Sequence, residues 1–234
     1  MKKNILYAGD SPAGGPANYL LAILKNLKVP FRHVPPSKIL KPGKFDAIIL
    51  SDFSRKNLPA ASEKKICEQV RQGSGLLMVG GWGSFSGPFG GWRGSMIEKL
   101  LPVQCLNHDD RLNFPAGALI KQKNRNSGVF NSLSFSNPPV ICGMNRIRVK
   151  PSGRVILTAR KIAGGKEYPL FIIDSNPGSR IAALTTDLAP HWCGGMVDWG
   201  TKRRILPVNE KIRVEIGNAY VNFVQSILKW LIRA

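Results

Sequence analysis

The chain has 234 residues, of which 43% are hydrophobic, and this length and composition are typical of a globular protein with a sizeable core. No apolar run approaches the roughly 20 residues that a membrane span requires, which argues against a membrane protein. Lys and Arg number 34 against 14 Asp and Glu, giving a formal net charge of +20. This charge predicts non-specific polyanion binding, whereas the lack of any aromatic-and-basic motif argues against specific nucleic-acid recognition.

The first half of the chain alternates short apolar runs with helical spacing. The apolar runs predict strands over Asn4–Ala8, Phe31–Val34, Phe45–Leu50 and Leu76–Val79. The spacing between them predicts helices over Ala17–Leu27 and from Ser62, as the N-cap, to Arg71. Because strands that alternate with helices form parallel sheets, we expect a parallel central sheet.

A glycine-rich corner, Gly80-Gly81-Trp82-Gly83, follows the last of these strands. In enzymes with a nucleophile elbow, such a strand-to-turn-to-helix corner holds a Ser or Cys between glycines. Gly81 and Trp82 stand at that place here. We therefore expect the scaffold of an elbow without its nucleophile.

The second half of the chain follows a different pattern. The stretch Asp110–Val149 has weak periodicity, which indicates an antiparallel extension or a long excursion. Three strands are predicted over Val155–Ala159, Leu170–Asp174 and Arg180–Thr185, the last two joined as a hairpin at Asn176-Pro177-Gly178. Val214–Leu231 is predicted to be one long amphipathic helix. Because no repeat or low-complexity linker is present, we expect a single domain over residues 1–234.

Several short motifs, in order along the chain, carry a resemblance to a known family. They are Leu50-Ser51-Asp52, Gly80-Gly81-Trp82, Leu101-Pro102-Val103, Asp109-Asp110-Arg111, Gly143-Met144-Asn145-Arg146, Thr186-Asp187-Leu188-Ala189-Pro190-His191-Trp192 and Trp230-Leu231. With these motifs the chain resembles the class I glutamine amidotransferase-like family, with a broader kinship to trehalose-utilisation-type proteins. The resemblance implies a flavodoxin-like three-layer α/β sandwich with a mostly parallel central sheet and an antiparallel extension.

The same resemblance bears on activity. True class I glutamine amidotransferases use a Cys at the elbow, together with a His and a Glu near the C-terminal strands. In this chain the elbow Cys is missing, and His191 lies near the place of the His with no Glu close by. We therefore expect no glutaminase activity.

Polar and aromatic residues follow the predicted strands, where open parallel sheets bind ligands. The candidate ligand-binding residues are Asp10, Ser11, Asp52, Gly81, Trp82, Asp109 and Trp192, and the candidate catalytic residues are His191 and Asp187. We expect Asp10, Asp52, Trp82, Asp187 and His191 to surround one concavity. Four of them also have a structural interpretation: Asp10 and Asp52 could form turns or caps, Trp82 could close the core edge, and His191 could be a hydrogen-bonded structural residue.

Two further arrangements are weighed. His108-Asp109-Asp110, with Asp187 and His191, could bind a divalent metal, but adjacent residues rarely ligate one ion together, so no metal site and no cofactor are predicted. Cys193 lies two residues from His191 and would face the same side on an extended segment. No third group that would orient such a Cys–His pair can be named.

The leading hypothesis is an amidotransferase-like protein that binds a small polar ligand, sugar-like rather than anionic, at the carboxyl edge of the sheet. One alternative is a hydrolase that uses His191 with Asp187 or a metal. Another is an interaction module whose basic surface recruits an acidic partner. The N-terminal apolar run Ile5–Ala8 is too short for a signal-peptide core, so a cytoplasmic location is expected. The sequence leaves the oligomeric state open, including a homo-oligomer.

Overall fold

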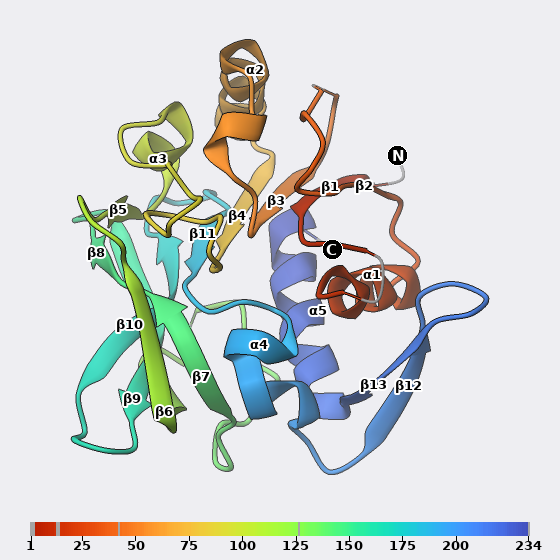
Figure 1. Cartoon of the computed structure of the whole chain (residues 1–234), viewed down its shortest axis with the longest axis vertical. Coiled ribbons are helices and arrows are strands. Elements are labelled where there is room, and N and C mark those ends of the chain that lie inside the picture. The colour runs from red at the N-terminus through yellow and green to blue at the C-terminus, as the bar shows by residue number, and fades with distance from the viewer. Residues whose placement is uncertain (1–2, 13–14, 42, 126, 234) are drawn as a thin grey trace.

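A mixed β-sheet forms the centre of the molecule (Figure 1), and the computed structural model describes residues 3–12, 15–41, 43–125 and 127–233. Its parallel part consists of β1 (Ile5–Gly9), β2 (Phe31–Val34), β3 (Ala47–Ser51), β4 (Gly75–Val79) and β11 (Ile181–Leu184). Its antiparallel part consists of β6 (Arg111–Gln122), β7 (Val140–Asn145), β9 (Gly153–Lys161) and β10 (Glu167–Asp174). Within the described residues these nine strands run in the order β2-β1-β3-β4-β11-β10-β9-β6-β7.

Helices cover both faces of the parallel part, as Figure 1 shows. One face carries α1 (Ala17–Asn26) and α5 (Asn218–Ile232), and the other carries α2 (Ala60–Arg71) and α3 (Met96–Leu100). Successive strand residues point to opposite faces, so Tyr7 packs with the α1 and α5 layer and Leu6 with the α2 and α3 layer. The predicted three-layer sandwich with an antiparallel extension is confirmed.

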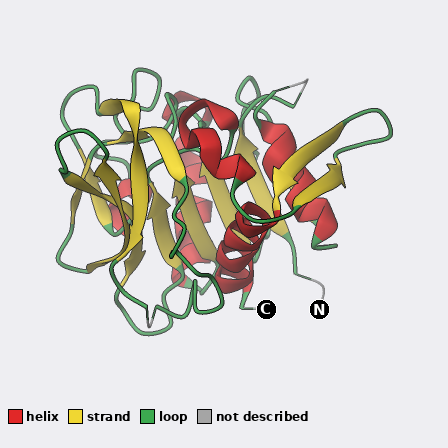
Figure 2. Cartoon of the chain, turned by 90° about the horizontal axis from the view of Figure 1, so that it is seen from below, coloured by secondary structure: helices red, strands yellow, loops and turns green. Residues whose placement is uncertain are grey.

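Several shorter elements lie outside the nine-stranded sheet. The short strands β5 (Val103–Cys105) and β8 (Ile147–Val149) pair with each other, as do β12 (Arg203–Pro207) and β13 (Arg213–Gly217). The β12–β13 ribbon projects from the body of the molecule in Figure 2. The remaining helical turns are α4 (Pro190–Cys193), η1 (Arg55–Asn57) and η2 (Gly194–Asp198). In the part of the chain that the structure describes, no helix is both long and apolar enough to cross a membrane.

Three predictions about local structure were wrong. The stretch predicted as one helix from Val214 is a strand as far as Gly217, because Val214 and Ile216 are buried with the period of two that a strand requires. Helix α2 begins at Ala60, with Pro59 as its N-cap, so Ser62 lies inside the helix and not at the cap.

The third concerns the glycine-rich corner. A series of turns, and no helix, follows β4 until α3 begins. Gly83, Gly87, Pro88, Gly90 and Gly91 lie in this stretch, and glycine and proline both disfavour helix. The predicted elbow scaffold therefore has its strand and turn but lacks the helix.

Candidate functional site

A cavity of about 450 Å³ lies at the carboxyl edge of the parallel strands. Its lining includes Asp10 after β1, Asp52 after β3, Gly81 and Trp82 after β4, and Asp187 and His191 after β11. The prediction that these side chains surround one concavity is confirmed. That they bind or react with a ligand stays a prediction.

The first two carboxyl groups stand on turns with unusual backbone angles. Asp10 has a φ of 45° and Asp52 a φ of 48°, in the left-handed region that Asp tolerates better than most residues. The Tyr7 hydroxyl donates a hydrogen bond to Asp10 Oδ2 at 2.6 Å, and the Gly83 N–H donates to Asp52 Oδ1. Burial raises the pKa of Asp10 to about 7 and also raises the pKa of Asp52.

Asp187 and His191, which follow β11, also line the cavity. Both Asp187 oxygens accept backbone hydrogen bonds, Oδ2 from Trp192 N–H at 3.0 Å and Oδ1 from Cys193 N–H at 2.7 Å. Despite these bonds, burial raises the pKa of Asp187 to about 7. His191 Nδ1 lies 4.0 Å from Asp187 Oδ2, beyond hydrogen-bond distance, and its side chain is 67% exposed. The hydrogen bonds of Asp187 therefore go to the backbone of α4, and its carboxyl group lies near His191 without bonding to it.

Trp82 joins this cavity to a smaller one of about 290 Å³, since Trp82 and His191 line both. The indole is 41% exposed, so it does not close the core edge. The Arg111 guanidinium stacks on it at 4.3 Å, and His191 meets it edge-on at 6.4 Å between ring centroids. Trp192 and Cys142 also line the smaller cavity.

The backbone of the glycine corner is tightly enclosed. A Cβ at Gly80 would lie 2.2 Å from the Thr185 carbonyl oxygen, and one at Gly81 would lie 2.6 Å from Asp52 Oδ1. Buried Asn145 accepts a hydrogen bond from Gly81 N–H at 2.9 Å and donates one to Asp110 Oδ1 at 2.6 Å. Neither glycine position therefore accepts a side-chain nucleophile without rearrangement.

Other candidate residues lie away from the main cavity. Ser11 is exposed and does not line it. Asp109 forms a surface ion pair with Arg111 at 2.7 Å, whereas its neighbour Asp110 is buried against Asn145. These neighbouring carboxyl groups therefore point apart. No group of three His, Cys, Asp or Glu side chains in the described ranges is placed to hold a metal ion.

The expectation that Cys193 faces the same side as His191 was wrong. The segment is the helical turn α4 and not an extended strand, so residues two apart point in different directions. Cys193 is buried, and burial raises the pKa of its thiol well above the ordinary value. A thiolate nucleophile at this position is not supported.

Sequence reasoning missed several lining residues. Tyr19 lies in the first turn of α1, and the helix after β1 begins at the carboxyl edge, so its position could have been predicted. Arg111 and Cys142 come from the antiparallel strands β6 and β7. No sequence pattern indicates how those strands fold back beside Trp82.

Comparison with known proteins places these observations in a family. Residues 34–209, about three quarters of the chain, match the sequence model of a protein family described as "Putative glutamine amidotransferase". None of the curated proteins compared with the chain matches it.

Solved structures share the fold. Cytoplasmic protein STM3548 from Salmonella typhimurium is 20% identical, with a TM-score of 0.75 over 97% of this chain and 98% of that one. Cytoplasmic protein STM1381 from Salmonella typhimurium LT2 is 22% identical, with a TM-score of 0.67 over 82% and 91%. A "Putative thua-like protein" from Bacteroides uniformis is 12% identical, with a TM-score of 0.58 over 98% and 91%. At these identities the likeness concerns the fold alone.

Proposed function

The chain belongs to the putative glutamine amidotransferase family, and we propose that it binds a small neutral polyol or sugar in the cavity at the carboxyl edge of its sheet. The observation that carries the proposal is the set of three carboxyl groups, from Asp10, Asp52 and Asp187, around one cavity beside a partly exposed indole. Carboxylates accept hydrogen bonds from hydroxyl groups, and protonated carboxyl groups also donate them.

The pKa values of the site support a neutral ligand. The pKa values of Asp10 and Asp187 are both raised to about 7, so near neutral pH each carboxyl is partly ionised. Ionised carboxylates repel an anionic ligand, whereas a polyol can both donate to and accept from such a mixed set. Trp82 adds an aromatic wall, and about 450 Å³ is within the usual range for small-molecule sites.

Thermal unfolding with a panel of hexoses, disaccharides, inositol and their phosphorylated forms tests the ligand class. A neutral polyol that binds the folded state should raise the melting temperature, since a concentration about 100 times Kd stabilises by about 2.7 kcal/mol. Calorimetric titration then compares Trp82→Ala with Phe89→Ala, because Phe89 is an exposed neighbour that does not line the cavity. Only Trp82→Ala should weaken binding. Stabilisation by phosphorylated sugars alone would contradict the proposal.

The absence of glutaminase activity is part of the same proposal. Its support is the corner itself, where a Cβ at Gly81 would overlap Asp52 and Trp82 carries an indole in place of a thiol. Incubation of the purified protein with glutamine should release no ammonia above the uncatalysed rate. Release that is lost in Cys142→Ala or Cys193→Ala would overturn this and show that another thiol replaces the elbow Cys.

Hydrolysis by His191 with Asp187 is the second candidate function. It is favoured by the exposure of the His191 side chain in the cavity and by the Asp187 carboxyl 4.0 Å away. Catalytic hydrogen bonds are often long before substrate binds. NMR spectra of a bound disaccharide over time distinguish the two functions. Cleavage that is lost in His191→Ala supports a hydrolase, and an intact ligand supports a binding protein.

A further inference from the structure

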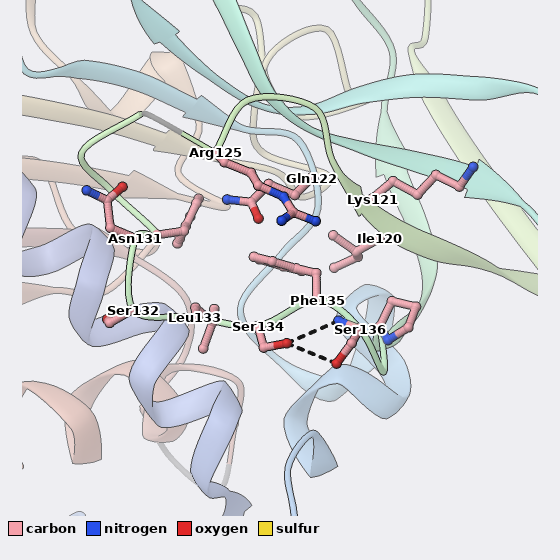
Figure 3. A pocket seen from close by; sticks show the side chains of 12 residues that line it. Ile120, Lys121, Gln122, Arg125, Asn131, Ser132, Leu133, Ser134, Phe135 and Ser136 are labelled. Atoms are coloured by element: carbon pink, nitrogen blue, oxygen red, sulfur yellow. Dashed lines mark hydrogen bonds between the residues drawn. The ribbon is translucent and has the colours of Figure 1, made fainter.

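A third cavity, of about 680 Å³, lies at the far end of β6 (Figure 3). Arg111, at the start of this twelve-residue strand, lines the smaller cavity beside Trp82, whereas Ile120 to Gln122, at its end, line this one. The other wall comes from the connection between β6 and β7, where Arg125, residues 130–136 and Pro138 line the cavity. The two sites therefore occupy opposite ends of one strand.

Aromatic packing holds this connection in place. Phe130 is buried, stacks on Phe223 of α5 at 5.0 Å, and meets Phe171 of β10 at 5.1 Å. Phe135 packs against Trp199 at 5.2 Å, and the Trp199 indole N–H donates to the Asn137 carbonyl at 2.9 Å. The cavity is thus bounded by segments anchored to the core, as preformed ligand sites are.

Two cationic side chains, Lys121 and Arg125, line the cavity, and only Arg125 is free to bind an anion there. Lys121 pairs with Glu167 at 3.4 Å, and Figure 3 shows its ammonium turned away from the centre. Arg125 is exposed, and no hydrogen bond or ion pair joins it to another residue of the described ranges. Its guanidinium points inward beside Gln122 and faces the Phe135 ring in Figure 3.

The lining opposite Arg125 combines hydroxyl groups with apolar surface. Ser134 and Ser136 bond to each other, Oγ to Oγ at 2.9 Å, at the lower edge of the cavity in Figure 3. Leu133 contributes aliphatic surface beside Phe135, and Ile120 lies in the core beneath the cavity with no exposed surface. An arginine guanidinium binds carboxylate and phosphate groups with two parallel hydrogen bonds, and aromatic and aliphatic walls bind the body of the same ligand.

We propose that this cavity is a binding site for a small organic anion. Arg125 binds its carboxylate or phosphate group, and Phe135 with Leu133 packs against its apolar body. The site is separate from the polyol cavity and does not depend on the function proposed there. Its chemistry is also the opposite, since the polyol cavity is lined by carboxyl groups and this one by an unpaired guanidinium.

The test uses phenyl phosphate and phenylacetate as anionic probes and benzyl alcohol as their neutral counterpart, measured by calorimetric titration of the whole chain. Both anions should bind, and benzyl alcohol should bind at least tenfold more weakly. Arg125→Gln should weaken both anions about tenfold or more, because a hydrogen bond to a charged group is worth about 1.5–3 kcal/mol. Arg125→Lys should restore part of the affinity, because it keeps the charge and loses the planar fork.

Arg213→Gln is the matched control, because Arg213 is exposed on the β12–β13 ribbon and does not line the cavity. It should leave both affinities unchanged. Equal weakening by Arg125→Gln and Arg213→Gln would show general attraction to a basic surface and overturn the proposal. Lack of binding by either anion, or binding of benzyl alcohol as tight as that of the anions, would overturn it as well.

Discussion

At the scale of single residues, the carboxyl edge of the sheet combines two features that oppose stability. Asp10 and Asp52 have left-handed backbone angles, and both carboxyl groups are removed from water far enough to raise their pKa values. Such backbone and electrostatic costs cluster at functional sites in folded proteins. Their coincidence at one cavity supports a binding role for these residues more strongly than the presence of acidic side chains alone.

The pH dependence of stability tests the burial of Asp10. Its pKa is raised from 3.8 to about 7, so between these values the folded state binds more protons than the unfolded chain. The contribution of this group to the free energy of unfolding therefore falls as pH rises through this window. Asp10→Asn removes this pH-dependent loss of stability, because the amide does not ionise, and its oxygen can still accept the hydrogen bond from the Tyr7 hydroxyl. Relative to the original chain, the variant should gain on the order of 1–3 kcal/mol at about pH 8 and almost nothing at about pH 4.

Urea unfolding at several pH values measures this difference. Glu210→Gln is the control, because Glu210 is an exposed acidic residue outside the cavity. If Glu210→Gln gives the same pH-dependent gain, the effect reflects the removal of any negative charge from a basic chain, and the explanation by burial of Asp10 is wrong.

The glycine corner offers a second test at this scale. Gly81 and Gly73 both have a positive φ, 149° and 104° respectively. A Cβ added at Gly81 would overlap Asp52, whereas a Cβ added at Gly73 would have no neighbour within 4 Å. Gly81→Ala should therefore destabilise by about 1–3 kcal/mol more than Gly73→Ala, since only the former adds steric overlap to backbone strain. Chemical denaturation of both variants measures this. Equal losses would mean that the corner relaxes freely and that the overlap with Asp52 does not require glycine at position 81.

At the scale of elements, some parts of the fold could be predicted from sequence and others could not. The strands β1, β3 and β4 are buried on both faces and appear as continuous apolar runs, so they were placed within one or two residues. The strand β13 was hidden because Val214 and Ile216 fit both a period of two and the start of the helical pattern of α5. Its partner β12 is short and mostly exposed, and its sequence has no apolar run that would indicate a strand.

The same contrast applies to the site. Residues after parallel strands could be predicted, because parallel strand ends meet at one edge whatever the details of packing. Arg111, Cys142 and the hydrogen bonds of Asn145 depend on how the antiparallel extension folds back, which is set by long-range packing and by no local pattern.

The link between β7 and the glycine corner is the contact through which this extension supports the site. Asn145 bonds both the N–H and the carbonyl of Gly81 and donates to buried Asp110, whose second oxygen accepts from Ser86 N–H at 2.7 Å. Asn145→Ala should cost about 3–5 kcal/mol, since it leaves one oxygen of the buried Asp110 carboxyl group and the Gly81 N–H and carbonyl without their partner.

A double-mutant cycle checks that these bonds act together. Asn145→Ala, Asp110→Ala and the double variant, compared by urea unfolding, should show a coupling of about 0.5–3 kcal/mol, with the double variant losing less than the sum of the single losses. Strict additivity would mean that the two residues contribute independently and that the network does not connect the extension to the corner.

At the scale of the whole molecule, the sign of the charge differs from place to place. The chain carries a formal +20, yet the cavity at the carboxyl edge is lined by three carboxyl groups and a single His. The carboxyl groups disfavour a polyanion inside that cavity, so we expect the positive surface and the candidate polyol site to bind different partners.

This separation gives the last prediction. The chain should bind two unrelated duplexes of about 20 base pairs equally at about 50 mM salt, and lose roughly 10³-fold or more in affinity by about 200 mM if six or more phosphates are neutralised. Fluorescence anisotropy of labelled duplexes measures both values. Saturation of the strand-end cavity with a polyol should not displace the DNA, because the carboxyl groups that line this cavity repel phosphates. A preference for one duplex that persists at high salt would instead indicate base recognition, and competition by the polyol would show that the two surfaces overlap.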